Sequence, residues 1–447
     1  MDYEAIWDKG LSEEAVRYLS KQKNEPEWML ELRLKAFEWF KKLELPPWVE
    51  GLEDLNYDEI IYYLKPKAEK AQSWEELPED IRKIYDQLGI PEAEKKYLAG
   101  VTAQFESSVL YEKVEQYLAE KGVIFISLDE AVQKYPELVR KYFAKLVPIN
   151  DNKFAALNTA FWSGGVFLYV PKGVKVDRIL QAYFRIQMQS LGQFERTLII
   201  VEEDAEVSYV EGCSAPIYSK ASLHAAVVEV FAHKRSRVRY TTVQNWSKNV
   251  YNLVTKRGMA YEGAYIEWLD GNMGSKVTYK YPGIILKEPY AKAKILSIAS
   301  ASSGQLIDSG GKAIHLAPHT SSTIISKSIS MGSGISKYRG WIKVAKGAKH
   351  AKVSVNCDAL LLDKESRTDT YPNIDIHEKD TQITHEATVG KIEEEQLFYL
   401  MSRGFDEETA KTMIVMGFVE EFIKEIPLEY AVELNRLIKL EMEGSIG

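Results

Sequence analysis

The chain has 447 residues, of which 45% are hydrophobic and 27% charged, a composition typical of soluble globular proteins with two or three domains. Its two cysteines, Cys213 and Cys357, are too few for a disulfide framework or a self-contained four-thiolate site for zinc or an iron–sulfur cluster. The net charge of −8 divides into −9 over residues 1–162, +12 over 163–360 and −11 over 361–447, which predicts three structural units.

The first unit, residues 1–160, is expected to be mainly helical. Ser12 precedes a short amphipathic segment that runs through Tyr18, and Pro26 begins a longer helix that ends before Pro46. Three more helices are expected in 79–88, in part of 92–120 and near 130–145, with a strand over 123–128.

The second unit, residues 161–390, is rich in Val, Ile, Tyr, Thr and Ser in short alternating runs, and it repeats. Equivalent apolar residues recur every 28 to 31 positions at Val176, Val207, Val238, Ile266, Ile295, Ile324 and Val353. A nearly constant period with β composition predicts a mainly β chain wound as a parallel β-helix (solenoid) of about seven coils. A β-sandwich would not keep such a period.

The third unit, residues 391–447, is expected to be a helical domain. One helix ends at Gly404, a second begins after Asp406 and runs through Phe418, and a third follows Pro427. Its apolar residues are too many for so small a unit to bury alone. They therefore pack on the β-helix or are offered to a partner, and the sequence leaves both open.

The two cysteines and a His-Glu pair are the candidates for chemistry. Cys357 shares one face of its strand with Val353, so it is either a small buried hydrophobe or a thiolate that accepts sulfur or iron. His385 and Glu386 are adjacent, and in an extended segment they point to opposite faces. Iron with Cys, His and Glu ligands is reasonable chemistry, but one chain supplies a short ligand set, which suggests a site shared between subunits.

Several function classes are disfavoured by the sequence. The acidic start has no secretion signal and no apolar run reaches the roughly 20 residues of a membrane span, which favours the cytoplasm. No Walker A pattern is found, and the basic residues are spread along the repeat without the features of a nucleic-acid surface. A carbohydrate-active β-helix enzyme would have clustered carboxylates on one solenoid face, and none are apparent.

Several sequence phrases along the chain resemble those of the SufB/SufD family of the SUF iron–sulfur cluster assembly machinery. The matching phrases extend from near residue 10 to the C-terminus and include KNEPEWMLELRLKAF (23–37), LGIPEAEKKYLAGV (88–101), NKFAALNTAFWSGGVFLYVPKGVKV (152–176), GQFERTLIIVEEDAEVSYVEGCSAP (192–216), VQNW (243–246), HEAT (385–388) and EEQLFYL (394–400). The NEPEWM helix and the two cysteine contexts favour the SufB branch, with a SufD-like structural partner as the alternative.

The resemblance implies a scaffold rather than an enzyme. Cys357, with His385 and Glu386, matches the ligands proposed for the nascent cluster, and Cys213 matches a cysteine proposed to receive persulfide sulfur. The positions thought to line a sulfur path between the thiols are matched by Arg185, Gln244, Trp246 and Lys256. Gln187 stands where the family usually has Asn, and it is therefore assigned more loosely.

The resemblance also implies partners. The C-terminal helical domain is expected to dock the ATPase SufC, and the end of the β-helix to pair with SufD or a second SufB copy. Sulfur is expected from a cysteine desulfurase or a sulfur-transfer protein. The expected cofactors are a transient iron–sulfur cluster and, in the assembled complex, reduced FAD. Neither nucleic acid nor membrane is expected as a partner.

Overall fold

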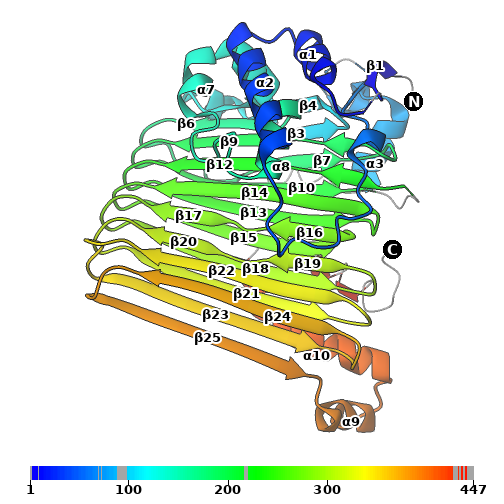
Figure 1. The fold of residues 1–447 in the computed structure, drawn as a ribbon, viewed down its shortest axis with the longest axis vertical. Helices are drawn as coiled ribbons and strands as arrows, with labels where there is room; N and C mark the ends of the chain where they lie inside the picture. Colours follow the sequence, from blue (N-terminus) through cyan, green and yellow to red (C-terminus); the bar gives the residue numbers. More distant parts are fainter. Residues whose placement is uncertain are drawn as a thin grey trace.

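The structure, a computed structural model, describes residues 3–8, 10–68, 70–71, 73–87, 98–215 and 220–425, together with 431, 434, 435, 438 and 439. Two long sheets face each other and form a parallel β-solenoid of about eight turns, with helices at both ends of the chain (Figure 1). The expected mainly β solenoid is thus confirmed. The coil beyond the seven anchors is the one that carries His385.

The first sheet contains one long strand from each coil. Its parallel strands are β7 (Ile179–Arg185), β10 (Glu206–Ser214), β13 (Arg237–Trp246), β15 (Tyr265–Gly274), β18 (Lys292–Ala301), β21 (Ser321–Ser330), β23 (Ala351–Leu361) and β25 (Thr381–Lys391). At the N-terminal end, β3 (Leu98–Phe105) pairs in parallel with β7, and β4 (Ser108–Val114) folds back on β3.

The second sheet closes the other side of each coil with shorter strands. They are β6 (Val166–Val170), β8 (Gly192–Gln193), β9 (Arg196–Val201), β11 (Ser222–His224), β12 (Val227–Ala232), β14 (Val250–Ala260), β16 (Val277–Lys280), β17 (Gly283–Leu286), β19 (Leu306–Ser309), β20 (Lys312–His315), β22 (Ile335–Val344) and β24 (Arg367–Ile376). The predicted strand at 123–128 is β5 (Ile124–Ser127), which pairs antiparallel with β6.

The register follows the predicted repeat with two offsets. Ile266 pairs with Ala293, two residues before the expected Ile295, and Ile324 pairs with Val355, two residues past the expected anchor. Because side chains alternate between the faces of a strand, a shift of two residues keeps every anchor on the inner face. The repeat therefore survives small changes in the length of its turns.

Most of the predicted helices at the N-terminal end are confirmed. They are α1 (Glu13–Gln22), α2 (Glu27–Lys42), α3 (Glu79–Gln87), α6 (Leu128–Lys134) and α7 (Pro136–Tyr142), joined by α5 (Gln116–Glu120), α8 (Lys153–Phe161) and a small sheet of β1 (Tyr3–Trp7) and β2 (Tyr63–Pro66). The side chain of Ser12 accepts a hydrogen bond from the Ala15 amide at 3.1 Å, which begins α1 as predicted.

The helix expected in part of 92–120 is confirmed only at Gln116–Glu120, whereas over 98–114 the chain forms the β3–β4 hairpin. Every residue of β3 is buried, because this strand covers the first coil by pairing with β7. Tertiary burial thus outweighs the Lys and Glu content of the segment. Residues 88–97 lie outside the described residues.

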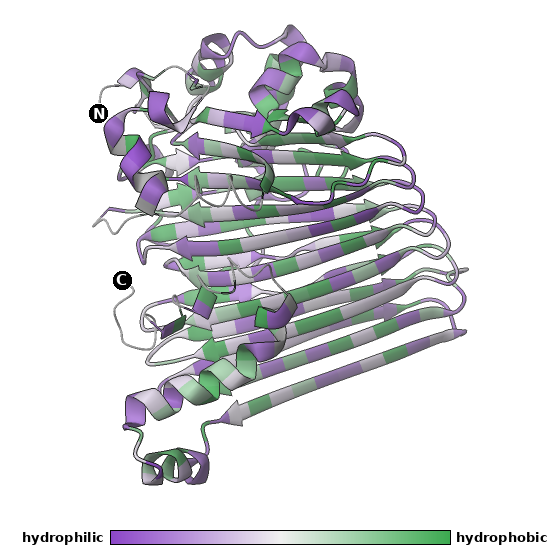
Figure 2. Ribbon diagram, turned by 180° about the vertical axis from the view of Figure 1, so that it is seen from behind, coloured by the Kyte–Doolittle hydropathy of each residue, from purple (hydrophilic) through white to green (hydrophobic). Residues whose placement is uncertain are grey.

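The C-terminal part contains α9 (Glu394–Ser402) and α10 (Glu407–Glu425), and the Asp406 side chain accepts a hydrogen bond from Thr409 at the start of α10. The helix predicted after Pro427 lies largely outside the described residues. Figure 2 shows α10 lying across the strands. On that outer face Val415, Val419 and Phe422 pack against Leu296 and neighbouring sheet residues.

The first alternative for the apolar residues of the C-terminal unit is confirmed for α10, which packs on the sheet, whereas the side chains of Phe398 and Tyr399 on α9 are exposed and their use by a partner stays a prediction. Within the described ranges, no helix is both long enough and apolar enough to cross a bilayer. The division at residues 160 and 390 stays a prediction. The first unit is not independent of the solenoid, since β3 and β5 belong to the two long sheets.

Candidate functional site

Stacking of the coils converts the inward positions of the first sheet into rows that run the length of the solenoid. Neighbouring strands place the following residues in one row: Glu211, Thr242, Asp270, Ser297, Ser326 and Cys357. Cys213 lies two residues from Glu211 on the same face. The two thiols are therefore near the two ends of one polar row. Five strand spacings separate their strands, or about 24 Å.

Cys213 is enclosed at the N-terminal end of this row. Its side chain is 2% exposed, and its Sγ lies 3.9 Å from Oε1 of Glu211, to which the thiol donates. Burial raises the pKa of the Cys213 thiol well above its usual range, and the carboxylates of Glu211 and Glu195 add to this, whereas Lys256 and Lys280 oppose it. The isolated chain therefore holds Cys213 as a protonated thiol.

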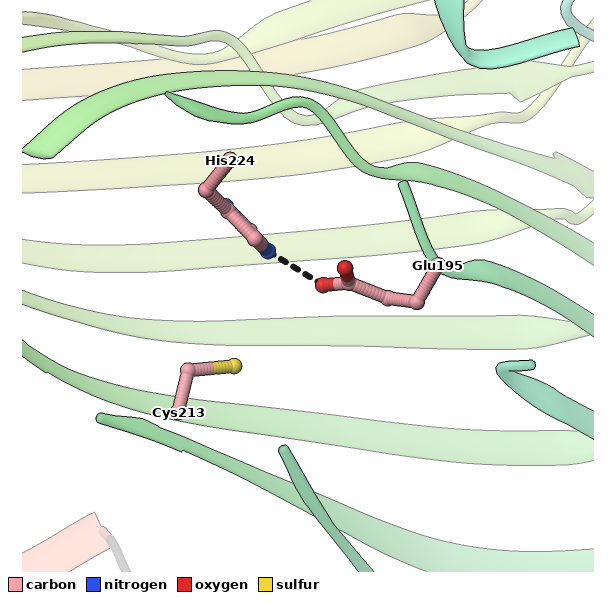
Figure 3. A group of neighbouring side chains, drawn as sticks. All are labelled: Glu195, Cys213 and His224. Carbon is pink, nitrogen blue, oxygen red and sulfur yellow. Dashed lines mark hydrogen bonds and ion pairs between the residues drawn. The ribbon is translucent and has the colours of Figure 1, made fainter. Parts of the chain in front are cut away.

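The side chains of Glu195 and His224 face Cys213 from the second-sheet side (Figure 3). One potential ligand atom of each of Glu195, Cys213 and His224 lies within 4.8 Å of the other two, and all three residues are buried. His224 Nε2 contacts Glu195 Oε1, and His224 Nδ1 lies 2.7 Å from Oδ1 of Asn252. Sequence reasoning missed Glu195 and His224, because only folding brings β11 and the segment before β9 to β10.

A buried charged cluster occupies the middle of the row. Oδ1 of Asp270 lies 3.2 Å from Nζ of Lys256 and 3.1 Å from Nζ of Lys280, and Lys256 also donates to Thr242. Burial opposes ionisation of Asp270, but the two ammonium groups hold its pKa below the usual range. Burial lowers the pKa of Lys280 to about 8. The interior between the thiols is thus polar and charged, with Lys280 poised to lose its proton at mildly alkaline pH.

Three of the four residues predicted to line a path lie in this interior. Gln244 is the residue next to Cys213 on the neighbouring strand, and its Oε1 accepts from Nδ2 of Asn252 at 2.9 Å. Trp246 packs on the His224 ring with a centroid distance of 4.6 Å. Lys256 belongs to the charged cluster described above.

The fourth, Arg185, lies on the other face of the sheet. Phe184 is the inward neighbour of Cys213, and Arg185 is paired with Ser214, one residue further along. The guanidinium donates to Ser214 Oγ at 2.7 Å and to Oε1 of Gln187 at 3.1 Å. The structure therefore does not bring Arg185 into the interior with Gln244, although Arg185 braces the strand residue that follows Cys213.

At the far end of the row, Cys357 is 5% exposed and faces Tyr338 of the second sheet. Burial raises the pKa of the Cys357 thiol to about 12, and the Tyr338 hydroxyl partly opposes this shift. The hydroxyl is close enough to act on the thiol, but within the described residues it has no partner at good hydrogen-bond geometry. Cys357 is therefore also a protonated thiol in the isolated chain.

The His-Glu pair is in β25, the last strand of the sheet. His385 pairs with Val355 and so faces inward, diagonally across from Cys357, whereas Glu386 pairs with Asn356 and faces outward. His385 Nε2 is buried and has no hydrogen-bond partner among the described residues. Because β25 is continuous, the prediction that the two side chains diverge is confirmed. In this conformation His385, and not Glu386, shares a face with Cys357.

The last coil is open at its end. Among the described strands, β25 pairs only with β23, and β24 pairs only with β22. Large apolar side chains are exposed there, namely Tyr371, Ile374, Ile376 and Val389. Unpaired strand edges with apolar side chains are surfaces on which another chain can add strands.

Comparison with known proteins gives matches along nearly the whole chain. Residues 12–182 match the family model described as SufBD protein N-terminal region, and residues 184–418 match SUF system FeS cluster assembly, SufBD core domain. Proteins named as iron-sulfur cluster assembly SufBD family proteins from Staphylococcus aureus (strain USA300) and Staphylococcus haemolyticus (strain JCSC1435) are each 57% identical over 440 residues, which cover 98% of this chain and 95% of theirs.

Proposed function

We propose, since this chain belongs to the SufBD family of SUF iron–sulfur cluster assembly proteins, that it is a SufB-type scaffold. Sulfur arrives at Cys213, and the cluster is built at Cys357. The observation that carries this proposal is the polar row that joins the two buried thiols. A solenoid that needed only stability would fill such positions with apolar side chains, as it does at the neighbouring inward positions Val207, Val238 and Ile266.

In this proposal, Cys213 receives sulfur as a persulfide from a cysteine desulfurase or a sulfur-transfer protein. The sulfane sulfur travels inside the solenoid, where bulk oxidants and thiols do not reach it. Gln244, Trp246 and Lys256 line the first part of the route. Conversion of sulfane sulfur to sulfide takes two electrons, and reduced FAD bound in the assembled complex is the proposed donor. Arg185 acts from the outer face by holding Ser214.

The cluster is proposed to form where Cys357 and His385 share the inner face of the last two coils. Ferrous iron is the second substrate there, and imidazole and thiolate are suitable ligands for it. Glu386 faces outward, so it joins the same ion only after the end coil rearranges or when iron bridges two chains. The open edge of β25 supports a shared site with SufD or a second copy of the chain. An incomplete ligand set favours release of the cluster.

The C-terminal helices are the proposed docking site for the ATPase SufC. Phe398 is 74% exposed and Tyr399 is 57% exposed on α9, while α10 is anchored on the sheet. Rigid-body movement of SufC upon ATP binding would thereby reach the coil that holds Cys357. Such an assembly operates in the cytoplasm, and the proposal includes neither a membrane nor nucleic acid as a partner.

A SufD-like structural partner is the second candidate. It is favoured by the outward direction of Glu386 and by the raised pKa of Cys357, because both leave the resting chain without an assembled ligand set. In this alternative, the chain stabilises a complex in which another subunit carries the cluster.

Anaerobic reconstitution with SufC, ferrous iron and a sulfur donor separates the two candidates. Visible absorption and Mössbauer spectra report the cluster, and mass spectrometry reports persulfide on each cysteine. A SufB-type scaffold loses the cluster in Cys357→Ser, while Cys213→Ser loses sulfur uptake and keeps cluster formation from free sulfide. Unchanged cluster yield in Cys357→Ser would favour the structural role.

A further inference from the structure

The directions of the hydrogen bonds around His224 are fixed by a lysine. At neutral pH, Nζ of Lys280 is an ammonium group that can only donate, and it lies 3.3 Å from Oε1 of Gln244, so this amide oxygen is an acceptor. Nδ2 of Asn252 donates to the same oxygen at 2.9 Å and to Thr278 at 3.2 Å. The Asn252 oxygen therefore faces Nδ1 of His224 and accepts its N–H at 2.7 Å.

This arrangement leaves Nε2 of His224 without a proton in the neutral tautomer, with its lone pair directed at Oε1 of Glu195. Two acceptors in contact need a proton or a cation between them. The other carboxylate oxygen, Oε2 of Glu195, is buried and has no hydrogen-bond partner among the described residues. Histidines that bind metals usually donate their other N–H to an oxygen, as His224 does to Asn252.

We propose that Glu195, Cys213 and His224 bind a divalent transition metal ion of the Fe²⁺ and Zn²⁺ class. A thiolate, an imidazole and a carboxylate form a mixed sulfur, nitrogen and oxygen donor set, which suits these ions. Mg²⁺ and Ca²⁺ prefer six or more oxygen ligands, which this group does not provide. Three protein ligands leave a coordination position for water or incoming sulfur.

Metal binding breaks the S–H bond of Cys213 and removes the proton shared by His224 and Glu195. Metal–sulfur, metal–nitrogen and metal–oxygen bonds replace them, two protons leave to water, and no atom changes oxidation state. The thiolate and the carboxylate then balance the +2 charge of the ion, so the buried site is neutral. The site is inferred from these side chains alone and does not rest on the proposed scaffold function.

Gln244 is a positioning residue for this metal site. By accepting from both Lys280 and Asn252, Gln244 sets which nitrogen of His224 faces the metal. Gln244→Leu removes this acceptor with little change in volume. Loss of such an outer partner typically weakens metal binding 10- to 100-fold, so that range is the expected effect on the dissociation constant.

The test is an anaerobic titration of the full, chelator-treated chain with Co²⁺ as the probe. Wild type is expected to bind Co²⁺ with a thiolate-to-cobalt charge-transfer band and a metal-dependent rise in melting temperature, and Cys357→Ser, which lacks the thiol of the proposed cluster site, is expected still to bind one equivalent. In the Cys357→Ser background, Cys213→Ser should lose the band and Glu195→Gln should weaken binding at least tenfold, whereas Cys357→Ser alone should keep the band of the Cys213 site and its affinity.

Circular dichroism establishes that each variant is folded, and Glu195→Gln and Gln244→Leu serve if Cys213→Ser does not fold. Absence of a thiolate band in folded wild type, or an unchanged band when Cys213→Ser is added to Cys357→Ser, would overturn the site. A band lost only in Cys357→Ser would move the metal to the other thiol and equally overturn it. Because sulfur and flavin are absent, this outcome is independent of the reconstitution that tests the scaffold function.

Discussion

Replacement of Asp270 by Asn tests whether the charged cluster inside the solenoid is a coupled unit. Asp270 lies within 3.2 Å of Lys256 and 3.1 Å of Lys280, and all three side chains are essentially inaccessible to solvent. Asn preserves the shape of Asp270 but leaves two buried ammonium groups without a counter-charge. Removal of one partner of a buried ion pair costs about 3–5 kcal/mol, which is the expected loss in the free energy of unfolding at pH 7.

The loss should depend on pH in a defined direction. The pKa of Lys280 is about 8 in the folded chain, below its value near 10.4 in an unfolded chain, so the unfolded state binds more protons between these values. Stability from this group therefore rises with pH across that window. Without Asp270 the folded pKa falls further, so the variant regains stability earlier. Its deficit relative to wild type should shrink between pH 7 and pH 9.

Urea-induced unfolding, followed by tryptophan fluorescence, measures both quantities. Asp358→Asn is the matched control, because Asp358 lies 3.7 Å from Lys327 in a partly exposed pair and should contribute less than about 1 kcal/mol. The reasoning is refuted if Asp270→Asn unfolds within 1 kcal/mol of wild type at pH 7, or if its deficit grows toward pH 9. Equal losses in the two variants would show that burial does not set the magnitude.

Three further changes probe the thiol, the docked helix and a tight turn. Tyr338→Phe removes a group that lowers the pKa of Cys357, so alkylation of Cys357 at pH 8–9, measured by mass spectrometry, should slow. Phe422→Ala empties a fully buried position between α10 and the sheet and should cost about 3–5 kcal/mol, whereas Phe398→Ala should change stability by less than about 0.5 kcal/mol in thermal unfolding. Gly274→Ala would place a Cβ 1.7 Å from a backbone oxygen at φ +74°, so soluble yield and melting temperature should both fall sharply.

Controls accompany each of these changes. Gly347 also has a positive φ, of +91°, but a Cβ there meets nothing within 4 Å, so Gly347→Ala should cost only about 1–2 kcal/mol of backbone strain. An equal effect of the two glycine substitutions would contradict the importance of the close approach. Alkylation of Cys213 is the internal reference for Tyr338→Phe. Unchanged alkylation of Cys357 would show that the hydroxyl does not act on the thiol.

The repeat was predictable because each coil buries its own Val or Ile, and so the same pattern recurs in the sequence. The helices that begin at Ser12 and Pro26 were predictable for local reasons, since the residue at the start of each one marks it. The β3–β4 hairpin was not predictable, because its strand character comes from pairing with β7, about 80 residues further along the chain. The secondary-structure preferences of residues 98–114 do not reveal this distant pairing.

The residues of the candidate site were likewise predictable only in part. Cys213 and Cys357 stand out in a chain with two cysteines, and the alternation of a strand already separates His385 from Glu386. Glu195 and His224 stand out much less, because each is one polar residue among many in its own strand region. Their proximity to Cys213 depends on how the second sheet closes over the first. Periodicity places residues along a coil, but it does not pair residues across the coil.

Because the coils stack at a constant spacing, the distance between two strands along the solenoid axis is a whole number of strand spacings. Each added or deleted coil would move Cys357 by one strand spacing of about 4.8 Å relative to Cys213. Length differences within a coil are absorbed in its turns, as the two-residue offsets at Ala293 and Val355 show. The distance between the two thiols along the solenoid is therefore set in steps of one strand spacing, and in this chain it is five spacings.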